Sequence, residues 1–343
     1  MDGSSAPPGP GPASDGGFGR TPPVIPDTPA GPLVTPAASA LEPDAAVAAA
    51  ASGSAGQRCA GYAVDAVDTA DPGPAAGSGH LAFRRVAGRT AVTRCAAVAP
   101  LKLLTPRRRG PAAWAYLGTF GGGLVAGDHV HLYADVHENA TAVLASQAPG
   151  KVFRRCGAEH ATQTLRAGVA GGGLLVVAPD ALTLFEDAHY VQEQTFELAA
   201  DASLVLLDWV HGGRVARGER WTLHRYDSLN RVSVGGTEKA FDRTRLDADA
   251  PAAGPFAAGP YDVLATLFFV GPRAAAGLDA AAAWTQTLGP PGAGPLQAAV
   301  SRRPWGGVLR LAGERPAAVA ATLRERLAFL EPELGAEVWS RRS

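Results

Sequence analysis

A glycine-rich turn that ends in an acid is the part of the sequence best suited to chemistry. Gly121, Gly122 and Gly123 stand in a row, and Gly127 directly precedes Asp128. Because glycine adopts positive φ at little steric cost, these residues predict a tight reversal of the backbone. Such a turn could cradle a phosphate, present ligands to a metal ion, or simply redirect the chain.

The residues behind the turn argue against a phosphate loop. A phosphate loop requires glycine amides that open a helix, followed by Lys and Ser or Thr in its P-loop form. Here apolar and polar residues alternate over 129–137, which predicts a strand. No Lys follows the glycines, and the Asp128 carboxylate would repel phosphate. Nucleotide binding at this turn is therefore disfavoured.

Two histidines on the predicted strand raise the possibility of a metal site. His129 and His131 lie on one side of the strand, a common arrangement for metal ligands. Together with Gly123 and Glu138 they approach the metal motif of cupin enzymes. However, the spacing from His131 to Glu138 exceeds the cupin spacing. We expect solvent-facing histidines, with a cupin-like metalloenzyme that uses His129 and His131 as the alternative.

A second segment combines acids, glycines and an arginine after an apolar run, at Asp208, Gly213, Arg214, Gly218 and Glu219. Arg214 could pair with Asp208 or Glu219 as a structural clamp. Alternatively, the two acids and His211 could bind a divalent cation. The sequence leaves both interpretations open.

A third segment, Lys151-Val-Phe-Arg-Arg-Cys156, is basic, and its Cys156 is spaced to share a strand face with His160. A soft metal pair is conceivable there, but a solvated basic edge strand is the better interpretation. The chain carries no GxSxG elbow, HExxH helix or paired-carboxylate signature. We therefore expect a protein that is not an enzyme.

Composition narrows the class of protein further. The net charge is −1 overall, but residues 1–79 hold eight acids and two arginines, a net of 2 − 8 = −6. The remainder is mildly basic, which is too weak for a nucleic-acid footprint. The three cysteines have no CxxC spacing, no apolar run is long enough to span a membrane, and no export signal is evident. These features predict a cytoplasmic protein.

The chain divides into two parts. Residues 1–79 are rich in Ala, Pro and Gly and have few large apolar residues, so we expect this extension to be disordered. Residues 80–343 predict a mainly β domain of short strands, including 174–178 and 204–210. We expect a few late helices, over 261–270, 274–288 and 316–330.

Four motifs in this order resemble the urease accessory protein D family (UreD, also called UreH). They are Gly121-Gly-Gly-Leu-Val-Ala-Gly-Asp128, Ser146-Gln-Ala-Pro-Gly-Lys-Val-Phe-Arg154, Val177-Ala-Pro-Asp-Ala-Leu-Thr-Leu-Phe185 and Leu207-Asp-Trp-Val-His-Gly-Gly-Arg-Val-Ala-Arg-Gly-Glu219. The resemblance runs from about residue 80 to Trp339. It departs from the family pattern at Ala126, which replaces a usual Gly, and at Gly150, which replaces a usual Thr or Ser.

The resemblance implies a β-helix-like, non-catalytic scaffold and chaperone for metalloenzyme maturation. Such a scaffold binds apo-urease, recruits UreF and through it UreG, and assists Ni²⁺ delivery without a tightly bound cofactor. Carboxylates that hold Ni²⁺ weakly suit this role. The residues expected on a transient nickel path are Asp128, Asp208, Glu219 and Asp180. The structural and motif positions expected to support them are Gly121, Gly122, Gly123, Gly127, Lys151, Gly213, Arg214 and Gly218.

Overall fold

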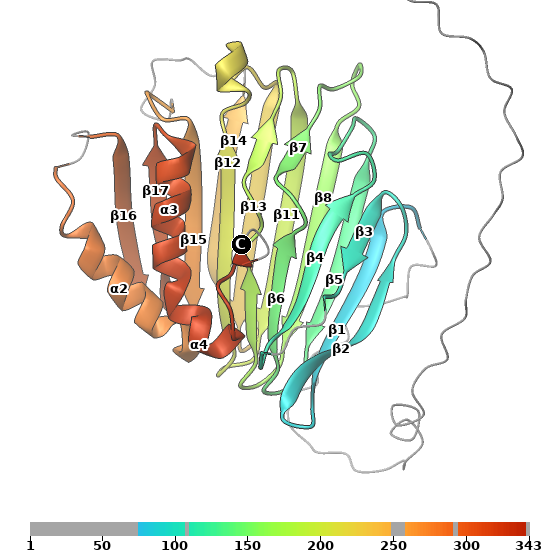
Figure 1. Ribbon diagram of the computed structural model, residues 1–343, viewed down its shortest axis with the longest axis vertical. Helices are drawn as coiled ribbons and strands as arrows, with labels where there is room; N and C mark the ends of the chain where they lie inside the picture. The colour runs from blue at the N-terminus through green and yellow to red at the C-terminus, as the bar shows by residue number, and fades with distance from the viewer. Residues whose placement is uncertain (1–74, 107–109, 248–257, 291–293, 341–343) are drawn as a thin grey trace, which may run out of the picture. The chain divides into compact units, whose positions relative to one another are not determined.

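The structure is a computed structural model that describes residues 75–106, 110–247, 258–290 and 294–340. These residues form two β-sheets and a group of C-terminal helices, so the chain is mainly β, as predicted (Figure 1). The first strand begins at Ser78, two residues before the predicted start. Apart from its last five residues, the predicted disordered segment 1–79 lies outside the described residues.

The first sheet, sheet A, has seven strands. In spatial order they are β14 (Thr237–Asp247), β13 (Arg225–Val234), β11 (His189–Leu198), β8 (Ala161–Val169), β5 (His129–Val136), β1 (Ser78–Val86) and β2 (Arg89–Ala97). The central strands are parallel, and the hairpins β1–β2 and β13–β14 close the two ends.

The second sheet, sheet B, has ten strands. Its main path is β16 (Leu296–Arg303), β17 (Gly306–Gly313), β15 (Val263–Val270), β12 (Ser203–His211), β9 (Leu174–Val177), β6 (Thr141–Ser146), β4 (Ala113–Thr119) and β3 (Leu101–Leu104). Two short strands lie off this path, β7 (Gly150–Val152) and β10 (Leu182–Leu184).

The chain winds repeatedly from sheet B to sheet A. β4, β6, β9 and β12 are parallel neighbours in sheet B, and β5, β8, β11 and β13 are parallel neighbours in sheet A. The chain therefore forms a β-solenoid, which confirms the β-helix-like expectation. We name the four connections from sheet B to sheet A the crossings; they comprise residues 120–128, 147–160, 178–188 and 212–224.

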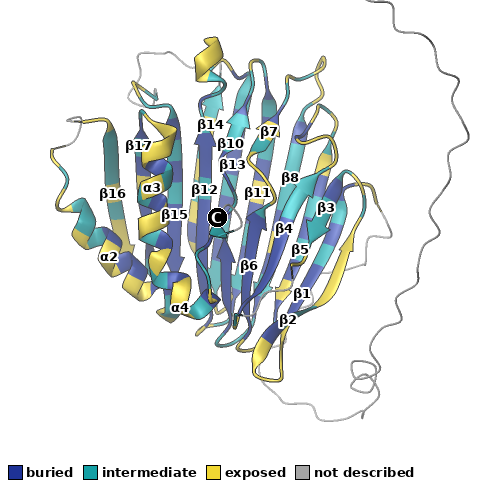
Figure 2. Ribbon diagram, viewed as in Figure 1, coloured by how far each residue is buried: buried dark blue, intermediate teal, exposed yellow. Residues whose placement is uncertain are grey.

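Two apolar cores hold the layers together (Figure 2). One lies between the sheets, and the other lies between sheet B and the helices. Strand β15 contributes to both, with Phe268 facing the first core and Phe269 facing the second. The predicted helix over 261–270 is therefore wrong. The residues of this run are apolar on both faces of the strand, so the sequence shows no alternation of apolar and polar residues. Without such a period, a buried strand cannot be distinguished from a buried helix.

The helices gather on sheet B, opposite sheet A (Figure 1). They are α2 (Ala275–Thr285), α3 (Pro316–Leu327) and α4 (Glu331–Leu334), with the 3-10 turns η2 (Pro272–Ala274) and η3 (Ala328–Leu330). A further 3-10 turn, η1 (Val215–Arg217), lies apart from them on the fourth crossing. The predicted helices near 274–288 and 316–330 are confirmed, and Val319, Leu323 and Leu327 form the expected buried stripe of α3. No helix among the described residues is long and apolar enough to cross a membrane.

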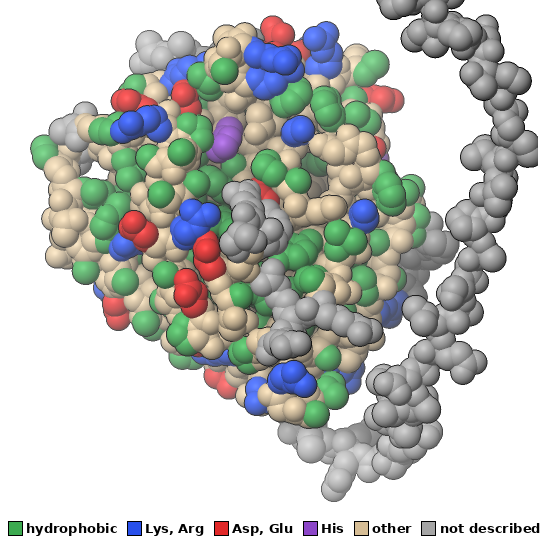
Figure 3. Space-filling view, in the orientation of Figure 1, with side chains coloured by type: hydrophobic (Ala, Val, Ile, Leu, Met, Phe, Trp, Pro, Cys, Tyr) green, Lys and Arg blue, Asp and Glu red, His purple; other side chains and the backbone are tan. Residues whose placement is uncertain are grey.

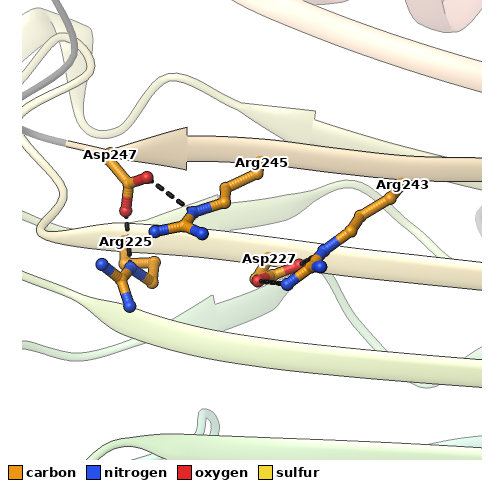
Figure 4. A network of polar contacts seen from close by, with 5 residues as sticks. All are labelled: Arg225, Asp227, Arg243, Arg245 and Asp247. Atoms are coloured by element: carbon orange, nitrogen blue, oxygen red, sulfur yellow. Dashed lines mark hydrogen bonds and ion pairs between the residues drawn. The ribbon is translucent and has the colours of Figure 1, made fainter.

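The outer face of sheet A carries ion pairs that join β13 to β14 (Figure 4). Arg243 donates two hydrogen bonds to Asp227, at 2.8 and 2.5 Å. Arg225 and Arg245 both donate to Asp247, at 2.5 and 2.6 Å. The Arg243–Asp227 and Arg225–Asp247 pairs span β13 and β14, away from the interior between the sheets, whereas Arg245 and Asp247 both lie on β14.

Candidate functional site

A cavity of about 490 Å³ lies beside the first three crossings and reaches between the two sheets. Its walls combine the glycine turn, the loop 147–151 and side chains from both sheets. The cavity thus gathers segments that are far apart in the sequence. Of the residues predicted from the sequence, it is lined by Gly121, Gly122, Gly123, Lys151, Asp180 and Asp208.

A break in sheet B makes room for this cavity. β9 pairs with β12 over Ser203–Leu206, whereas β10 pairs with β12 over Val210–His211. Among the described strands, none pairs with 207–209 on that side of β12. A similar interruption separates β6, which ends at Ser146, from β7. Asp208 therefore stands at a gap in the sheet.

Asp208 is held in place by four hydrogen-bond donors from sheet A. Gln192 Nε2 and Tyr226 Oη donate to its Oδ1 at 3.3 and 3.2 Å. Ser228 Oγ and Asn230 Nδ2 donate to its Oδ2 at 2.6 and 2.9 Å. A carboxylate has about four lone-pair sites, so these donors account for its full accepting capacity. The result is a fixed negative charge at the cavity wall.

Buried polar side chains continue this network through the interior. Gln192 accepts a hydrogen bond from Tyr190 at 3.2 Å and donates one to Ser228 at 3.0 Å. Burial, and secondly the charge of Asp208, raises the pKa of both Tyr190 and Tyr226. Both phenols therefore remain neutral hydrogen-bond donors at physiological pH.

Asp180 supplies the second carboxylate of the cavity. Its side chain is buried, with a relative exposure of 4%, and accepts a hydrogen bond from Ser146 Oγ at 2.7 Å. The Asp180 backbone N–H donates in return to the same Ser146 oxygen, also at 2.7 Å. This reciprocal contact joins the third crossing to the end of β6, so two of the family-like motifs meet at one point.

The glycine turn has the backbone that its sequence predicted. Gly121, Gly122 and Gly127 have φ of +87°, +73° and +85°. Gly123 is required for a different reason, because a Cβ there would lie 2.6 Å from the ring of Phe153. Leu124 then hydrogen-bonds to the second crossing on both sides, to Lys151 and Phe153. The turn therefore packs directly against the second crossing.

Asp128 closes its own turn and does not line the cavity. Its Oδ2 accepts a hydrogen bond from the Val125 N–H at 2.9 Å, and its own N–H donates to the Val125 carbonyl. Ala126 keeps a negative φ, so its methyl group is accommodated without strain. The role of Asp128 on a nickel path stays a prediction.

The fourth crossing contains an arginine clamp, and the partner of Arg214 is Glu219 and not Asp208. Arg214 Nε donates to Glu219 Oε2 at 2.7 Å and Arg214 Nη2 contacts Oε1, while the guanidinium stacks on Phe185 at 4.1 Å. Hydrogen bonding to Arg214 lowers the pKa of Glu219. Gly213 is confined beside this clamp, since a Cβ there would lie 2.3 Å from the Glu219 carbonyl oxygen. Neither clamp residue lines the cavity.

The predicted basic edge strand is shorter than expected. Only Gly150–Val152 is a strand; it pairs with β10, and its Val152 also forms an isolated bridge with Leu124. Arg154 and Cys156 follow it as isolated bridges. Lys151 is exposed at the cavity opening, and Arg155 pairs with Asp187 at 3.0 Å. The second crossing is thus basic at its start and is tied to the third crossing further on.

The histidines of β5 lie on the outer face of sheet A. His129 contacts Thr162 through Nδ1 at 2.8 Å, and burial lowers the pKa of His131, with smaller effects from His129 and Arg166. His211 and Asp208 point to opposite faces of β12, as strand alternation requires. Over the described ranges, no three His, Cys, Asp or Glu side chains are grouped to hold a metal ion. The cupin-like arrangement is therefore not supported.

A row of histidines was not predicted. His160, His189 and His224 stand at the starts of the neighbouring strands β8, β11 and β13. His189 stacks on His160 with ring centroids 4.4 Å apart, and lies 5.3 Å from the ring of His224. Burial, together with the charges of the neighbouring histidines and arginines, lowers the pKa of His189 to about 4. Only the solenoid register brings these residues together, so no local pattern could have found them.

Together, the fold and the cavity define a β-solenoid whose parallel coils are joined by motif-bearing crossings, with a cavity that holds the buried Asp180 and the hydrogen-bonded Asp208. The chain belongs to the UreD urease accessory protein family, because the model of that family matches residues 75–342. Relatives found by comparison are named urease accessory protein UreD or urease accessory protein D. The resemblance drawn from the four motifs is thereby confirmed.

Three relatives illustrate the match. The urease accessory protein UreD of Sorangium cellulosum is 46% identical over 269 residues, 78% of this chain and 84% of that protein. UreD of Anaeromyxobacter sp. is 41% identical over 273 residues, 78% of this chain and 89% of that protein. Urease accessory protein D of Arabidopsis thaliana is 39% identical over 173 residues, 49% of this chain and 59% of that protein.

Proposed function

We propose that this chain is a non-catalytic scaffold in urease maturation. It binds apo-urease, recruits UreF and through it UreG, and assists the transfer of Ni²⁺ to the urease active site. Family membership supports the accessory role. The observation that supports an involvement with a cation is the cavity, whose wall holds the buried acid Asp180 and the anchored acid Asp208.

The hydrogen bonding of Asp208 is suited to passage of an ion and not to its storage. Its four protein donors fix the carboxylate, so it offers a negative charge without free lone pairs for chelation. A fixed charge in a partly desolvated cavity attracts a cation more strongly than the same charge in bulk water. Oxygen ligands also hold Ni²⁺ less tightly than imidazole or thiolate groups do. This agrees with a transient Ni²⁺ cargo and no tightly bound cofactor.

Reconstitution of urease tests this proposal. Apo-urease would be activated with UreF, UreG, Ni²⁺ and bicarbonate, with and without the full chain, and both activity and nickel per active site would be measured. We expect both quantities to depend on the chain. Equal activation in its absence would overturn the proposed role.

A further inference from the structure

The cavity extends through sheet B at the break beside β12. Leu207 and Trp209 belong to the core between sheet B and the helices, whereas Asp208 points between the two sheets. All three residues nevertheless line the cavity. A cavity confined to the space between the sheets would not reach residues on both faces of one strand. The cavity therefore continues through the break toward the helix side of sheet B.

Two tryptophans close the break on its helix side. β9 ends at Val177, and among the described residues no backbone N–H donates to the carbonyls of Ala178 and Pro179, which follow it. Instead, the Nε1 of Trp339 donates to the Ala178 oxygen at 3.2 Å, and the Nε1 of Trp209 donates to the Pro179 oxygen at 3.0 Å. The centres of the two indole rings lie 5.8 Å apart. The indoles thus satisfy carbonyls that the interrupted strand leaves without a backbone partner.

Trp339 belongs to a terminal segment that lies outside both sheets. Helix α4 ends before Gly335, which has a φ of +74°, and residues 336–340 form no strand and no α-helix. Val338 and Trp339 anchor this segment, and each is only 2% exposed. Because no strand ladder includes the segment, it can detach while the hydrogen bonds of sheet B stay intact.

A contact with α3 supports Trp339 from outside. The guanidinium of Arg324 lies 5.8 Å from the centre of the Trp339 ring and also forms an ion pair with Glu337. Both partners of this ion pair are partly exposed, so the pair contributes little to holding the segment closed. Trp209 has no comparable freedom, because its strand β12 is paired with β15.

We propose that residues 336–340 are a latch, and that the cavity has a second opening beneath it, through the break in sheet B. Withdrawal of Trp339 would uncover the Ala178 carbonyl and one side of Trp209, a residue of the cavity wall. Figure 3 looks onto the helix side of sheet B, the face on which this opening would lie. The proposal rests on the proposed function, to which it adds a gated outlet for the cation.

The position of Asp180 gives the latch a consequence for a bound cation. Asp180 directly follows the two carbonyls that the indoles cover, and it is buried while the latch is closed. Opening would admit water beside this carboxylate. Water would solvate both the carboxylate and the departing ion, which lowers the cost of separating their charges.

Labelling of an engineered cysteine reports the opening without nickel. Leu207→Cys would be introduced into a chain whose three native cysteines are replaced by serine, and its reaction with a small cationic methanethiosulfonate would be timed. Leu207 suits this purpose because it is fully buried and lines the cavity from the helix side. Trp339→Ala removes the ring of the latch, and Trp339→Phe keeps a ring but removes the donor to Ala178.

Trp284→Ala is the matched control. Trp284 also packs against the core between sheet B and the helices, and it also contacts an arginine of α3, with Arg326 at 5.1 Å from its ring centre. It does not line the cavity. A general loosening of the helices would therefore appear in Trp284→Ala as well as in the Trp339 variants.

We expect Trp339→Ala to speed labelling at least about tenfold, which corresponds to an opening that is about 1.4 kcal/mol easier. Trp339→Phe should give a smaller increase and Trp284→Ala none. If Trp339→Ala does not fold, Trp339→Phe alone decides. Labelling at the wild-type rate in the Trp339 variants, or equal acceleration by Trp284→Ala, would overturn the latch.

Nickel release separates the latch from the proposed function. Chains loaded with Ni²⁺ would be mixed with EDTA, and release should be faster from Trp339→Ala than from Trp284→Ala. Faster labelling without faster release would overturn the assignment of the opening as an ion outlet. Faster labelling, together with urease activation that does not depend on the chain, would leave the latch standing and refute the nickel role.

Discussion

Asp208 on β12 accepts a 2.6 Å hydrogen bond from Ser228 on β13, so the two sheets of the solenoid are joined by a carboxylate at the cavity wall. This contact crosses the interior of a structure whose remaining inter-sheet contacts are largely apolar. A charge in such a place costs desolvation energy unless it is hydrogen-bonded. The surrounding donors offset that cost, and the charge is kept where it faces the cavity.

Replacing Asp208 by Asn tests whether that charge is needed for nickel transfer. The amide keeps the shape of the carboxylate but removes the charge. Its NH₂ group would face hydrogen-bond donors of sheet A in place of an acceptor, and this mismatch should cost about 1–3 kcal/mol of folding stability. A loss of about 1.4 kcal/mol in attraction for the cation would lower its occupancy about tenfold. We expect urease to contain less nickel after maturation, as measured by elemental analysis, while the complex with urease still forms.

Asp227→Asn is the matched control for that variant. Asp227 is also a partly buried carboxylate with hydrogen-bonded partners, but it pairs with Arg243 on the outer face of sheet A (Figure 4). Its replacement should lower stability and leave the nickel content of urease unchanged. Equal nickel contents with Asp208→Asn and the wild type would contradict a role for the Asp208 charge.

Acid should weaken the fold through His189. The folded pKa of about 4 lies below the unfolded value near 6.5, so below pH 6.5 the unfolded chain binds a proton that the folded chain does not. Stability contributed by this residue is therefore present above pH 6.5 and is lost as pH falls toward 4. His189→Phe keeps a ring beside His160 and His224 but cannot titrate. Its urea unfolding midpoint should therefore fall less between pH 7 and pH 5 than the midpoint of the wild type does. His129→Phe on β5 is the control, and an unchanged pH dependence in His189→Phe would refute the assignment.

The sequence was most informative where one face of an element is buried. The alternation after Asp128 predicted β5, because its apolar residues face the core and its histidines face solvent. The stripe of α3 was predicted for the same reason. β15 was missed because both of its faces are buried, and such burial removes the alternation on which the prediction depends.

The site was predicted in part, through its motifs and not through its contacts. The four motifs lie on the four crossings, and the solenoid register places them side by side, a relationship that no single segment encodes. Gln192 and Asn230 were missed because a polar residue in an alternating strand ordinarily indicates the solvent face. Here the same alternation points them inward, toward Asp208.

The glycines of the fourth crossing should differ in their tolerance of a side chain. Gly218 has φ of +82° and open space around a Cβ, so Gly218→Ala should cost about 1–2 kcal/mol through backbone strain alone. Gly213 has φ of +106°, and its Cβ would lie 2.3 Å from the Glu219 carbonyl oxygen, so the crossing must also move. In thermal unfolding, the melting temperature of Gly213→Ala should be clearly lower than that of Gly218→Ala. Equal melting temperatures would contradict the packing described for this crossing.

Two conservative variants of the clamp decide between the roles considered for Glu219. Glu219→Gln removes the charge, and Arg214→Lys keeps its charge but loses the bidentate fork and the planar stack on Phe185. If Glu219 acts only as the partner of Arg214, both variants should loosen the fourth crossing, which would be measured as faster proteolysis within 212–224. In that case both variants should also change the nickel content of urease equally, or not at all. If Glu219 binds passing Ni²⁺, Glu219→Gln alone should lower the nickel content. The bidentate contact leads us to expect that the two variants behave alike, and a nickel deficit confined to Glu219→Gln would show that expectation to be wrong.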